Sequence, residues 1–432
     1  MEIGLQELVL LLYMSGTLLS GLVLRPDRII PRAYVLAIFF LPSQAVLDIP
    51  GPIPPLDKLG AVSFPALLLL IAAKRDLRGL RWKASDRLAV AFLGMIVAAN
   101  LAAGNKPYAV AARSLDLLVT FTMPYLAGRL WARKPDQLVK LTRFIITVGF
   151  LYVPFMVIEF RLAPQFARLI YDSQVSFAQS ARYGFFRPFM FFRHALDLGH
   201  TMTLVLGFAI AYRIWLSGRR NRGEKPPSIT IAALLLAVLL SMSRGPVMGA
   251  ILIICGYHFF RRHAWRLGWF LGISGMLLFT WMVWTASAHQ VVDLLGLGGD
   301  ARAQSLAYRF AQIDAYSPLF HHRPYLGHGH PIPRNYWYPI IDGTMLLLAM
   351  EAGLLCLGLF TAWVLAICRQ GMGAWERRPG LGAITGAFFA IQVGWLLFSA
   401  WGDSFLSSFH FFLGGALVSQ AKYRVKDYLP GP

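Results

Sequence analysis

Long apolar runs recur along the whole chain, separated by short stretches that are rich in charged residues, proline or glycine. Hydrophobic residues make up 57% of the chain and charged residues 14%, a balance that excludes an ordinary soluble protein. No alternating pattern typical of barrel strands recurs, so the runs predict helices. We predict an all-α polytopic integral membrane protein, a single transmembrane domain over 1–432 with about 12–13 membrane-spanning helices. The predicted helices lie near residues 5–23, 33–49, 59–73, 87–103, 108–128, 141–159, 196–216, 228–242, 246–260, 267–285, 342–367, 381–400 and 405–420.

Basic residues cluster at every second connection between these runs. The orientation rule for membrane proteins assigns such clusters to the cytoplasmic side, so the other connections face outward. The C-terminus is then inside and, if the first run spans the membrane, the N-terminus is outside. Orientation and lipid contact explain much of the net charge of +20, and nucleic-acid binding is not needed to account for it. The clusters are Arg25, Arg28 and Arg32; Lys74, Arg75, Arg78, Arg81 and Lys83; Arg129, Arg133 and Lys134; Arg219, Arg220, Arg222 and Lys225; Arg261, Arg262 and Arg266; Arg369, Arg377 and Arg378; and Lys422, Arg424 and Lys426.

The segment 241–246, Ser-Met-Ser-Arg-Gly-Pro, places an arginine at a turn between two apolar runs. Each run has about 15 residues and covers about 22 Å, less than the hydrocarbon core of about 30 Å. Arg244 should therefore lie below the membrane surface, in a cavity where such charges line substrate paths or pair with anions. Pro246 after Ser243 indicates a helix start, whose free amide groups would face the same cavity. The alternative is an arginine that ties two helices together through backbone carbonyls.

Two outward segments are long, 160–195 and 286–341, and both contain arginines but no lysine. A guanidinium grips phosphate oxygens with two parallel hydrogen bonds, whereas an ammonium acts as a point charge, so this bias favours a diphosphate ligand. The alternative is that individual arginines pair with nearby aspartates or lie on lipid headgroups. The arginines are Arg161, Arg168, Arg182, Arg187, Arg193, Arg302, Arg309, Arg323 and Arg334, and the aspartates are Asp172, Asp197, Asp293, Asp300 and Asp314.

Within the first of these segments, the stretch 183–194 interleaves aromatic and apolar residues with Arg187 and Arg193. We expect this stretch to lie in the plane of the lipid headgroups with its apolar side down. It would then present both arginines to a lipid-linked headgroup. An ordinary interfacial belt would have the same composition.

Five of the ten histidines occupy the second segment: His289, His321, His322, His328 and His330. A neutral imidazole is the usual general base for activating a sugar hydroxyl. The spacing of these histidines matches known zinc sites poorly, so no metal is predicted. In the next helix, Glu351 is predicted to be a structural partner for a buried arginine such as Arg113, with Asp116 as a local partner one turn away from that arginine. None of the three cysteines lies in an outward segment, so no disulfide framework is predicted.

Several short motifs stand in a characteristic order along this half of the chain. They are Ser243-Arg244-Gly245, Tyr308-Arg309-Phe310, the run 323–329 (Arg-Pro-Tyr-Leu-Gly-His-Gly), Asp342-Gly343-Thr344 and Glu351-Ala352-Gly353. In these motifs the chain resembles the bacterial O-antigen ligase and O-antigen polymerase superfamily, which consists of membrane glycosyltransferases of the GT-C type. The resemblance covers about residues 190–365, and the remainder is similar only as a scaffold of many helices.

The resemblance implies transfer of a glycan from undecaprenyl diphosphate to a sugar hydroxyl on the periplasmic side of the bacterial inner membrane, without a cofactor or a metal. The implied partners are the lipid-linked glycan donor, a glycan or lipid-linked glycan acceptor, and membrane lipids. By position, Arg244 looks like the family's intramembrane diphosphate-binding arginine, and Arg187 or Arg193 like its loop arginine. The expected substrate-binding residues are Arg187, Arg193, Arg244, Arg309 and Arg323, and the candidate bases are His328, His330 and Asp342.

In ligases a histidine commonly precedes an asparagine where the last outward segment meets its helix, and here that place has Asp342-Gly343. This departure favours a polymerase of O-antigen or exopolysaccharide repeat units over a ligase that transfers glycan to lipid A core. An alternative of another class is a transporter or flippase of an anionic lipid-linked glycan, which would use the arginines as a path without chemistry. The histidine-rich segment and the lack of detectable internal repeats argue against a transporter.

Overall fold

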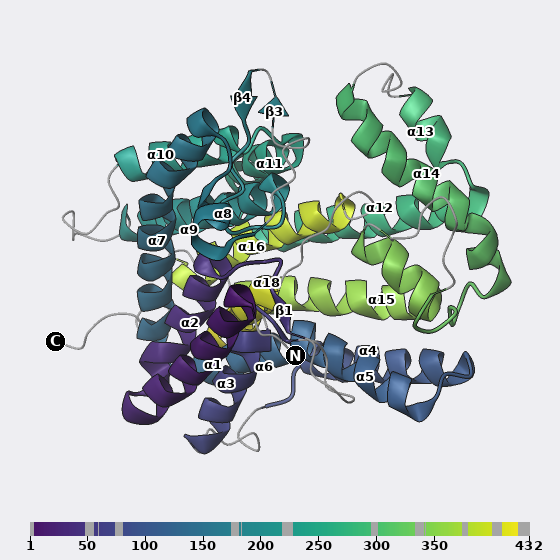
Figure 1. The fold of residues 1–432 in the computed structure, drawn as a ribbon, viewed down its shortest axis with the longest axis horizontal. Helices are drawn as coiled ribbons and strands as arrows, with labels where there is room; N and C mark the ends of the chain where they lie inside the picture. The colour runs from purple at the N-terminus through teal and green to yellow at the C-terminus, as the bar shows by residue number, and fades with distance from the viewer. Residues whose placement is uncertain are drawn as a thin grey trace.

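The computed structural model describes residues 4–47, 56–58, 60–73, 81–173, 181–182, 184–217, 228–294, 301–332, 341, 343–373, 379–399 and 408–421. Within these residues the fold is helical, apart from turns and two short antiparallel strand pairs, β1–β2 and β3–β4 (Figure 1). The elements in chain order are α1 (Leu5–Val23), α2 (Pro26–Phe40), β1 (Val46–Leu47), β2 (Leu56–Asp57), α3 (Gly60–Ala72), α4 (Ala84–Ala102), α5 (Pro107–Leu117), the π-helical turn η2 (Leu118–Thr122), α6 (Met123–Trp131), α7 (Pro135–Leu162), α8 (Phe166–Tyr171), β3 (Ala181–Arg182), β4 (Phe185–Phe186), α9 (Ala195–Ser217), α10 (Ser228–Leu240), α11 (Arg244–Phe260), the 3-10 turn η5 (Arg261–His263), α12 (Ala264–Thr285), α13 (Ala288–Leu294), α14 (Ala301–His322), α15 (Thr344–Met372), α16 (Leu381–Phe398) and α18 (Ser408–Gln420).

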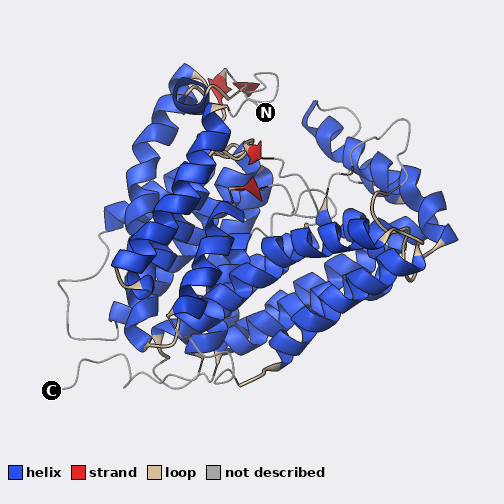
Figure 2. Ribbon diagram, turned by 60° about the horizontal axis from the view of Figure 1, so that its bottom comes forward, coloured by secondary structure: helices blue, strands red, loops and turns tan. Residues whose placement is uncertain are grey.

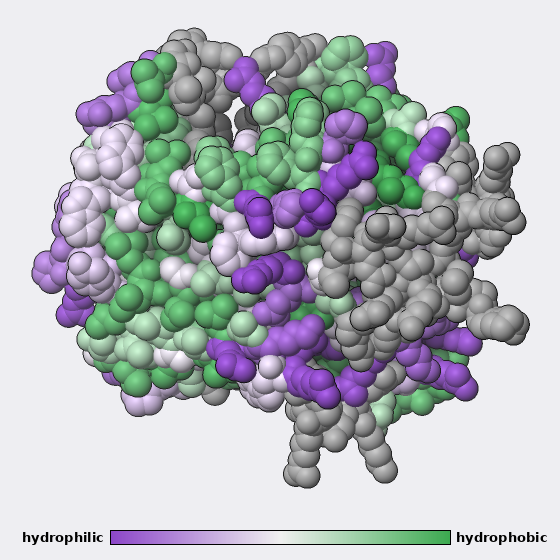
Figure 3. All heavy atoms as spheres, turned by 180° about the vertical axis from the view of Figure 1, so that it is seen from behind, coloured by the Kyte–Doolittle hydropathy of each residue, from purple (hydrophilic) through white to green (hydrophobic). Residues whose placement is uncertain are grey.

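Every predicted apolar run overlaps a helix, which confirms an all-α polytopic membrane protein. Seven helical segments are long and apolar enough to cross a bilayer: α1, α4, α7, α9, the stretch from α11 through α12, α15 and α16. Helices α3 and α10 are apolar but shorter. The 13 residues of α10 rise only about 20 Å, so the run before Arg244 is as short as predicted. Figure 3 shows apolar residues over much of the exposed surface, as expected for a protein whose solvent is lipid.

The boundaries of several helices differ from the prediction, and prolines explain those of α2. The run predicted at 33–49 forms α2, Pro26–Phe40, which starts on one proline and ends ahead of Pro42. The fixed φ of proline suits the first helical position, and its ring restricts the residue before it, so proline begins and ends helices. The helix predicted to start at Pro246 starts at Arg244, which is therefore the first helical residue rather than a turn residue.

The second outward segment, predicted as a long loop, contains a helical hairpin of α13 and α14. The buried residues of α14 recur at a spacing of three or four residues, which places them on one face of the helix. They include Phe310, Ile313, Tyr316 and Phe320. Helix α14 contacts α12, α13 and α15, so this part of the segment is a packed helical unit.

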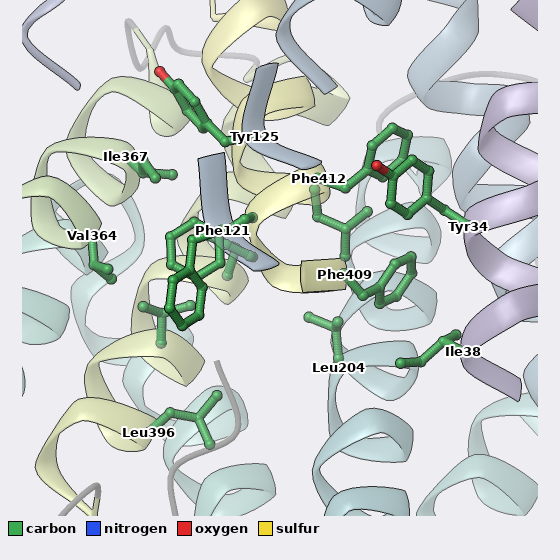
Figure 4. Packing of buried hydrophobic residues seen from close by; sticks show 14 of the residues in the cluster. Tyr34, Ile38, Phe121, Tyr125, Leu204, Val364, Ile367, Leu396, Phe409 and Phe412 are labelled. Atoms are coloured by element: carbon green, nitrogen blue, oxygen red, sulfur yellow. The ribbon is translucent and has the colours of Figure 1, made fainter. Parts of the chain in front are cut away.

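Helix α18 lies within the core, and every residue from Ser408 to Gln420 is buried. Phe412 of α18 stacks on Tyr34 of α2 with ring centroids 4.1 Å apart (Figure 4). Gly128 of α6 and Gly415 of α18 face each other so closely that a β-carbon at either would lie 2.0 Å from a backbone carbonyl oxygen of the other helix. Such small residues let helix backbones approach each other where lipid provides no hydrophobic drive between helices.

The two outward segments lie at the same end of the molecule. Figure 2 shows the β3–β4 pair of the first segment and the α13–α14 hairpin of the second at one end of the helices. This common position agrees with the sidedness that the basic clusters predict. Residues that these segments carry can therefore face one compartment.

Candidate functional site

The turn between α10 and α11 is contacted by a side chain from the first outward segment. Arg187, directly after β4, is buried, with 9% of its surface exposed. Its Nε donates to the backbone carbonyl oxygen of Ser241 at 3.1 Å, and its Nη2 donates to Oγ of Ser243. Arg187 and Arg244, which are far apart in the sequence, therefore meet at one turn. The alternative considered for Arg244, an arginine that ties two segments together through a backbone carbonyl, describes Arg187 instead.

Helix α11 begins at this turn with uncapped amide groups. Ser243 occupies the N-cap position, but its Oγ donates to the carbonyl oxygen of Ser241 at 3.0 Å and makes no cap bond to the helix. The N–H groups of Arg244 and Gly245 have no hydrogen-bond partner among the described residues, and Pro246 has no N–H. Free amides at the positive end of a helix dipole attract anions.

The side chain of Arg244 is exposed and forms no ion pair with any described residue. The start of α11, which carries Arg244, rests on α9 and α16. Trp395 donates from Nε1 to the carbonyl oxygen of Gly245 at 2.9 Å. A β-carbon at Gly199 would lie 2.6 Å from Pro246, so α9 and the start of α11 are in close contact. The turn is therefore fixed by Arg187 on one side and by tight helix packing on the other.

Residues 189–192 of the aromatic stretch pack into the protein, so for these four residues the prediction of an interfacial position is wrong. Residues 189–192 are each at most 6% exposed, and Phe192 packs edge-on against Phe39 and Tyr152. Apolar side chains suit a protein interior and a lipid interface equally, so composition could not distinguish the two. Arg193 is exposed as predicted and makes no side-chain hydrogen bond or ion pair with the described residues.

A lysine that the sequence does not single out lies beside this stretch. Lys58, between β2 and α3, is buried, and its Nζ lies 4.9 Å from the centroid of the Phe192 ring. Burial lowers the pKa of Lys58 to about 8, and the carboxylates of Asp197 and Asp57 oppose that shift. Lys58 therefore adds a positive charge at neutral pH that is lost as the pH rises through about 8.

The motif 323–329 docks on a break in α15. The helix is interrupted at Gly353, whose φ of 73° is one that side chains disfavour, and a β-carbon there would lie 2.2 Å from the carbonyl group of Tyr325. The break frees backbone groups of α15, and the motif pairs with them. The bonds run from the N–H of Leu354 to Pro324 (2.9 Å), of Leu355 to Tyr325 (3.4 Å), of His328 to Met350 (2.9 Å) and of Gly329 to Glu351 (2.8 Å).

The two candidate histidines differ in what their rings contact. Nε2 of His328 lies 2.7 Å from the carbonyl oxygen of Leu319, which can only accept, so Nε2 is the donor in this hydrogen bond. His330 is held by its backbone: its N–H donates to Oδ1 of Asn100 at 2.8 Å, and its carbonyl oxygen accepts from Nδ2 of Asn105 at 3.0 Å. The His330 ring makes no hydrogen bond with any described residue. His330 is thus fixed in place while its ring is available.

The predicted partnership of Glu351 and Arg113 is confirmed. Glu351 is fully buried, and Arg113 donates to its two carboxylate oxygens from Nε at 2.8 Å and from Nη2 at 2.6 Å. Nη1 of Arg113 donates to Asp116, the local partner that the sequence predicts. A bidentate pair of this kind gives each oxygen of the buried carboxylate a charged hydrogen-bond donor.

His330 lies within the electrostatic reach of this ion pair. Burial and then the charge of Arg113 lower the pKa of the His330 imidazole, while Glu351 and Asp116 oppose the shift. A histidine whose pKa is lowered stays neutral at neutral pH and can accept a proton.

The remaining predicted site residues are dispersed. Arg309 lies half-buried on α14, and Arg323 is exposed at the end of the same helix. Asp342 lies outside the described residues. Among the aspartates considered as arginine partners, Asp314 instead caps α13 and bonds His289 at 2.8 Å.

The structure thus brings predicted residues together in two groups. We call Arg187, Arg244 and their turn the arginine group, and His328, His330 and the contacts that hold them the histidine group. Within the described part of the chain, no hydrogen bond or ion pair links Arg244 to His328 or His330.

Comparison with known families matches the part of the chain that carries Arg244, His328 and His330. Residues 229–361 match the family described as O-antigen ligase. This match, over about a third of the chain, supports the resemblance to the O-antigen ligase and polymerase superfamily. The matched region runs from α10 into α15, and it contains Arg244, Arg309, His328, His330 and Glu351. No curated protein and no solved structure matches the chain.

Members of the matched family are membrane enzymes of the glycosyltransferase type, and the family implies a lipid-linked glycan and an acceptor as substrates. Residues outside the matched region support both groups, and no motif in the sequence points to them. They are Lys58, Asn100, Asn105 and Glu159. One signal was available, because Glu159 is an acid near the end of an apolar run, as Glu351 is near the start of one. The asparagines resemble ordinary helix ends in sequence, and only their long-range bonds reveal their role.

Proposed function

We propose that this protein transfers a glycan from undecaprenyl diphosphate to a sugar hydroxyl at the periplasmic face of the bacterial inner membrane, as a polymerase of O-antigen or exopolysaccharide units. The observation that carries the proposal is the arginine group, in which Arg187 meets the uncapped start of α11 and the exposed Arg244. A guanidinium beside free helix amides is a site for a phosphate group. The family match supports a lipid-linked glycan as the substrate.

The arginine group suits the leaving group of this reaction. As the bond between the anomeric carbon and the diphosphate oxygen breaks, the lipid diphosphate gains negative charge. Arg244 and the free amides of α11 are in place before the reaction, so they stabilise that charge without rearrangement. Arg193, Arg309 and Arg323 are proposed as further contacts to the donor.

The histidine group suits the other half of the reaction. The acceptor oxygen forms the new bond to the anomeric carbon and gives its proton to a base. We favour His330 as that base because its ring is unbonded and its pKa is lowered, with His328 and Asp342 as the other candidates. The outward position of both groups is supported by the common end at which the two outward segments lie (Figure 2).

The product of the reaction tests the proposal. The purified protein, reconstituted in lipid, is incubated with an undecaprenyl-diphosphate-linked oligosaccharide, with and without lipid A core. A longer lipid-linked polymer is expected. Glycan on lipid A core would make the chain a ligase, and movement of intact donor across the membrane without a product would make it a transporter. Arg244→Ala should lower the yield of product about 10²–10³-fold, while its gel-filtration elution volume and its melting temperature stay those of the wild type.

A further inference from the structure

Glu159 is a buried acid, 1% exposed, that lies close to the end of α7. It forms no ion pair with any described residue. Its carboxylate instead accepts four backbone N–H bonds, two on each oxygen. Oε1 accepts from Gln165 (3.1 Å) and Phe166 (3.0 Å), and Oε2 accepts from Phe189 (2.9 Å) and Met190 (2.8 Å). Four such bonds satisfy a carboxylate that would otherwise be costly to bury.

The four donors belong to two separate segments that the carboxylate joins. Gln165 and Phe166 lie at the start of α8, directly after the end of α7. Phe189 and Met190 lie just after Arg187, and Met190 has a φ of 52°, a conformation that few non-glycine residues adopt. Glu159 therefore fixes the backbone immediately beside the buried arginine of the arginine group.

The same end of α7 also holds the strand before Arg187. Phe160 stacks on Phe185 of β4 with ring centroids 4.8 Å apart, and the guanidinium of Arg161 lies 5.7 Å from the centroid of that ring. Arg187 is thus held from both sides, by β4 on its N-terminal side and by the carboxylate of Glu159 on its C-terminal side.

A continuous path of contacts leads from Glu159 to the proposed diphosphate site. The carboxylate bonds the backbone at 189–190, Arg187 bonds Ser241 and Ser243, and Ser243 directly precedes Arg244. Because Oγ of Ser243 is engaged by Arg187 and Ser241, it leaves the first amides of α11 uncapped. A shift of Arg187 would release that hydroxyl to cap the helix and compete with an anion.

We propose that Glu159 is a positioning residue that sets Arg187 and the turn 241–243 for binding of the donor diphosphate. This inference rests on the proposed function. A carboxylate is suited to gathering four N–H groups, whereas the amide of a glutamine would turn its own N–H₂ toward two of them.

The first test measures binding of undecaprenyl diphosphate to the protein in lipid nanodiscs. Glu159→Ala should weaken binding about 10–100-fold, the loss typical when a group that orients a binding residue is removed. Asp136→Ala is the matched control: Asp136 lies on the same helix, is exposed and pairs only with Lys140 within the described structure. Binding by the control should equal that of the wild type.

The second test asks whether Glu159 acts through Arg187. If it does, Glu159→Ala combined with Arg187→Ala should bind no more weakly than Arg187→Ala alone. A purely structural role would give losses that add. Should Glu159→Ala fail to fold, Glu159→Gln is used in both tests, because its amide oxygen can still accept bonds from one of the two segments.

The outcomes separate the inference from the proposed function. The positioning role is supported by three results together. The wild type binds undecaprenyl diphosphate, Arg244→Ala does not bind it, and Glu159→Ala weakens binding in the wild type but not in the Arg187→Ala background. If Arg244→Ala fails to bind but Glu159→Ala binds normally, or its loss adds to that of Arg187→Ala, the positioning role is refuted and the proposed function stands. If Arg244→Ala binds as the wild type does, the diphosphate site is refuted, and the role of Glu159 in it falls too.

Discussion

The arginine group and the histidine group are fixed in place by different means. In the arginine group, charged side chains hold backbone: the carboxylate of Glu159 accepts four N–H groups and Arg187 donates to the turn at 241–243. In the histidine group, backbone mainly pairs with backbone, through the motif 323–329 and the break at Gly353. The first group depends on individual ionised residues, and the second depends on the path of the chain.

The two groups also differ in the charge that they leave exposed. Arg244 is an exposed cation without an ion-pair partner in the described part of the chain. Near His330, by contrast, the cation of Arg113 is closed off by Glu351 and Asp116, and the imidazole is kept neutral. An unpaired cation can bind an anion, and a neutral imidazole can accept a proton. The contrast therefore matches the two halves of a glycosyl transfer, stabilisation of the leaving group and deprotonation of the acceptor.

The largest expected effect is on the exposed cation. Arg244→Ala should lower glycan transfer about 10²–10³-fold, as when one preorganised donor to a developing negative charge is removed. Arg244→Lys should recover only part of the activity, because an ammonium keeps the charge but not the planar fork. The measurement is initial rate in proteoliposomes, with Arg262→Ala in η5 as the exposed control. Equal rates for Arg244→Ala and this control would remove the arginine group from the mechanism.

The next effect falls on the closed ion pair and concerns stability. Glu351→Gln should lower the free energy of unfolding by about 3 kcal/mol, because Arg113 loses its bidentate partner in a buried place and keeps only Asp116. Adding Arg113→Met should recover much of this loss, since no buried charge is then left uncompensated. Unfolding in mixed micelles measures both variants. If the double variant is less stable than Glu351→Gln, Arg113 stabilises the fold by contacts other than its ion pair with Glu351.

That ion pair shows how far the sequence alone could go. An acid deep in an apolar run needs a buried cation, so the partnership of Glu351 with Arg113 was predictable, as were the helices themselves. The short helix before Arg244 was predictable for the same kind of reason, because a count of apolar residues gives its length.

What the sequence could not supply are contacts between segments that are distant in the chain. The meeting of Arg187 with the turn at 241–243 depends on how the first outward segment folds back, which periodicity does not encode. The aromatic stretch 189–192 was misassigned because lipid and protein interior select the same side chains. The hairpin α13–α14 was missed because its apolar spacing is interrupted by polar residues.

A third effect tests the neutral ring of the histidine group. His330→Gln should lower transfer about 10²-fold, the lower end of what a general base contributes, while His328→Gln should cost less because its Nε2 is already committed to Leu319. Since burial and Arg113 lower the pKa of His330, the rate should fall only when the pH drops below the usual histidine range. Asp116→Asn should move this acid limb to still lower pH, because the carboxylate of Asp116 raises that pKa.

A pH–rate profile of these variants distinguishes the candidates for the base. If His330→Gln keeps both its rate and its acid limb, the base is another group, and the histidine group would be a structural contact only. If Asp116→Asn shifts the limb to higher pH, the titrating group is not the His330 ring.

The smallest effect concerns Asp314 of the α13–α14 hairpin, which forms no described hydrogen bond or ion pair with His328, His330 or the arginine group. Asp314 accepts the N–H groups of Ala288 and His289 and bonds the His289 ring, so Asp314→Ala removes a helix cap and should cost about 1 kcal/mol of stability. Asp293→Ala on the exposed side of α13 is the matched control. Transfer by both variants should equal that of the wild type, because a cap at α13 holds neither the exposed cation nor the neutral ring. A loss of transfer with Asp314→Ala at unchanged folding would mean that the hairpin takes part in binding, and the division into two groups would have to include a third.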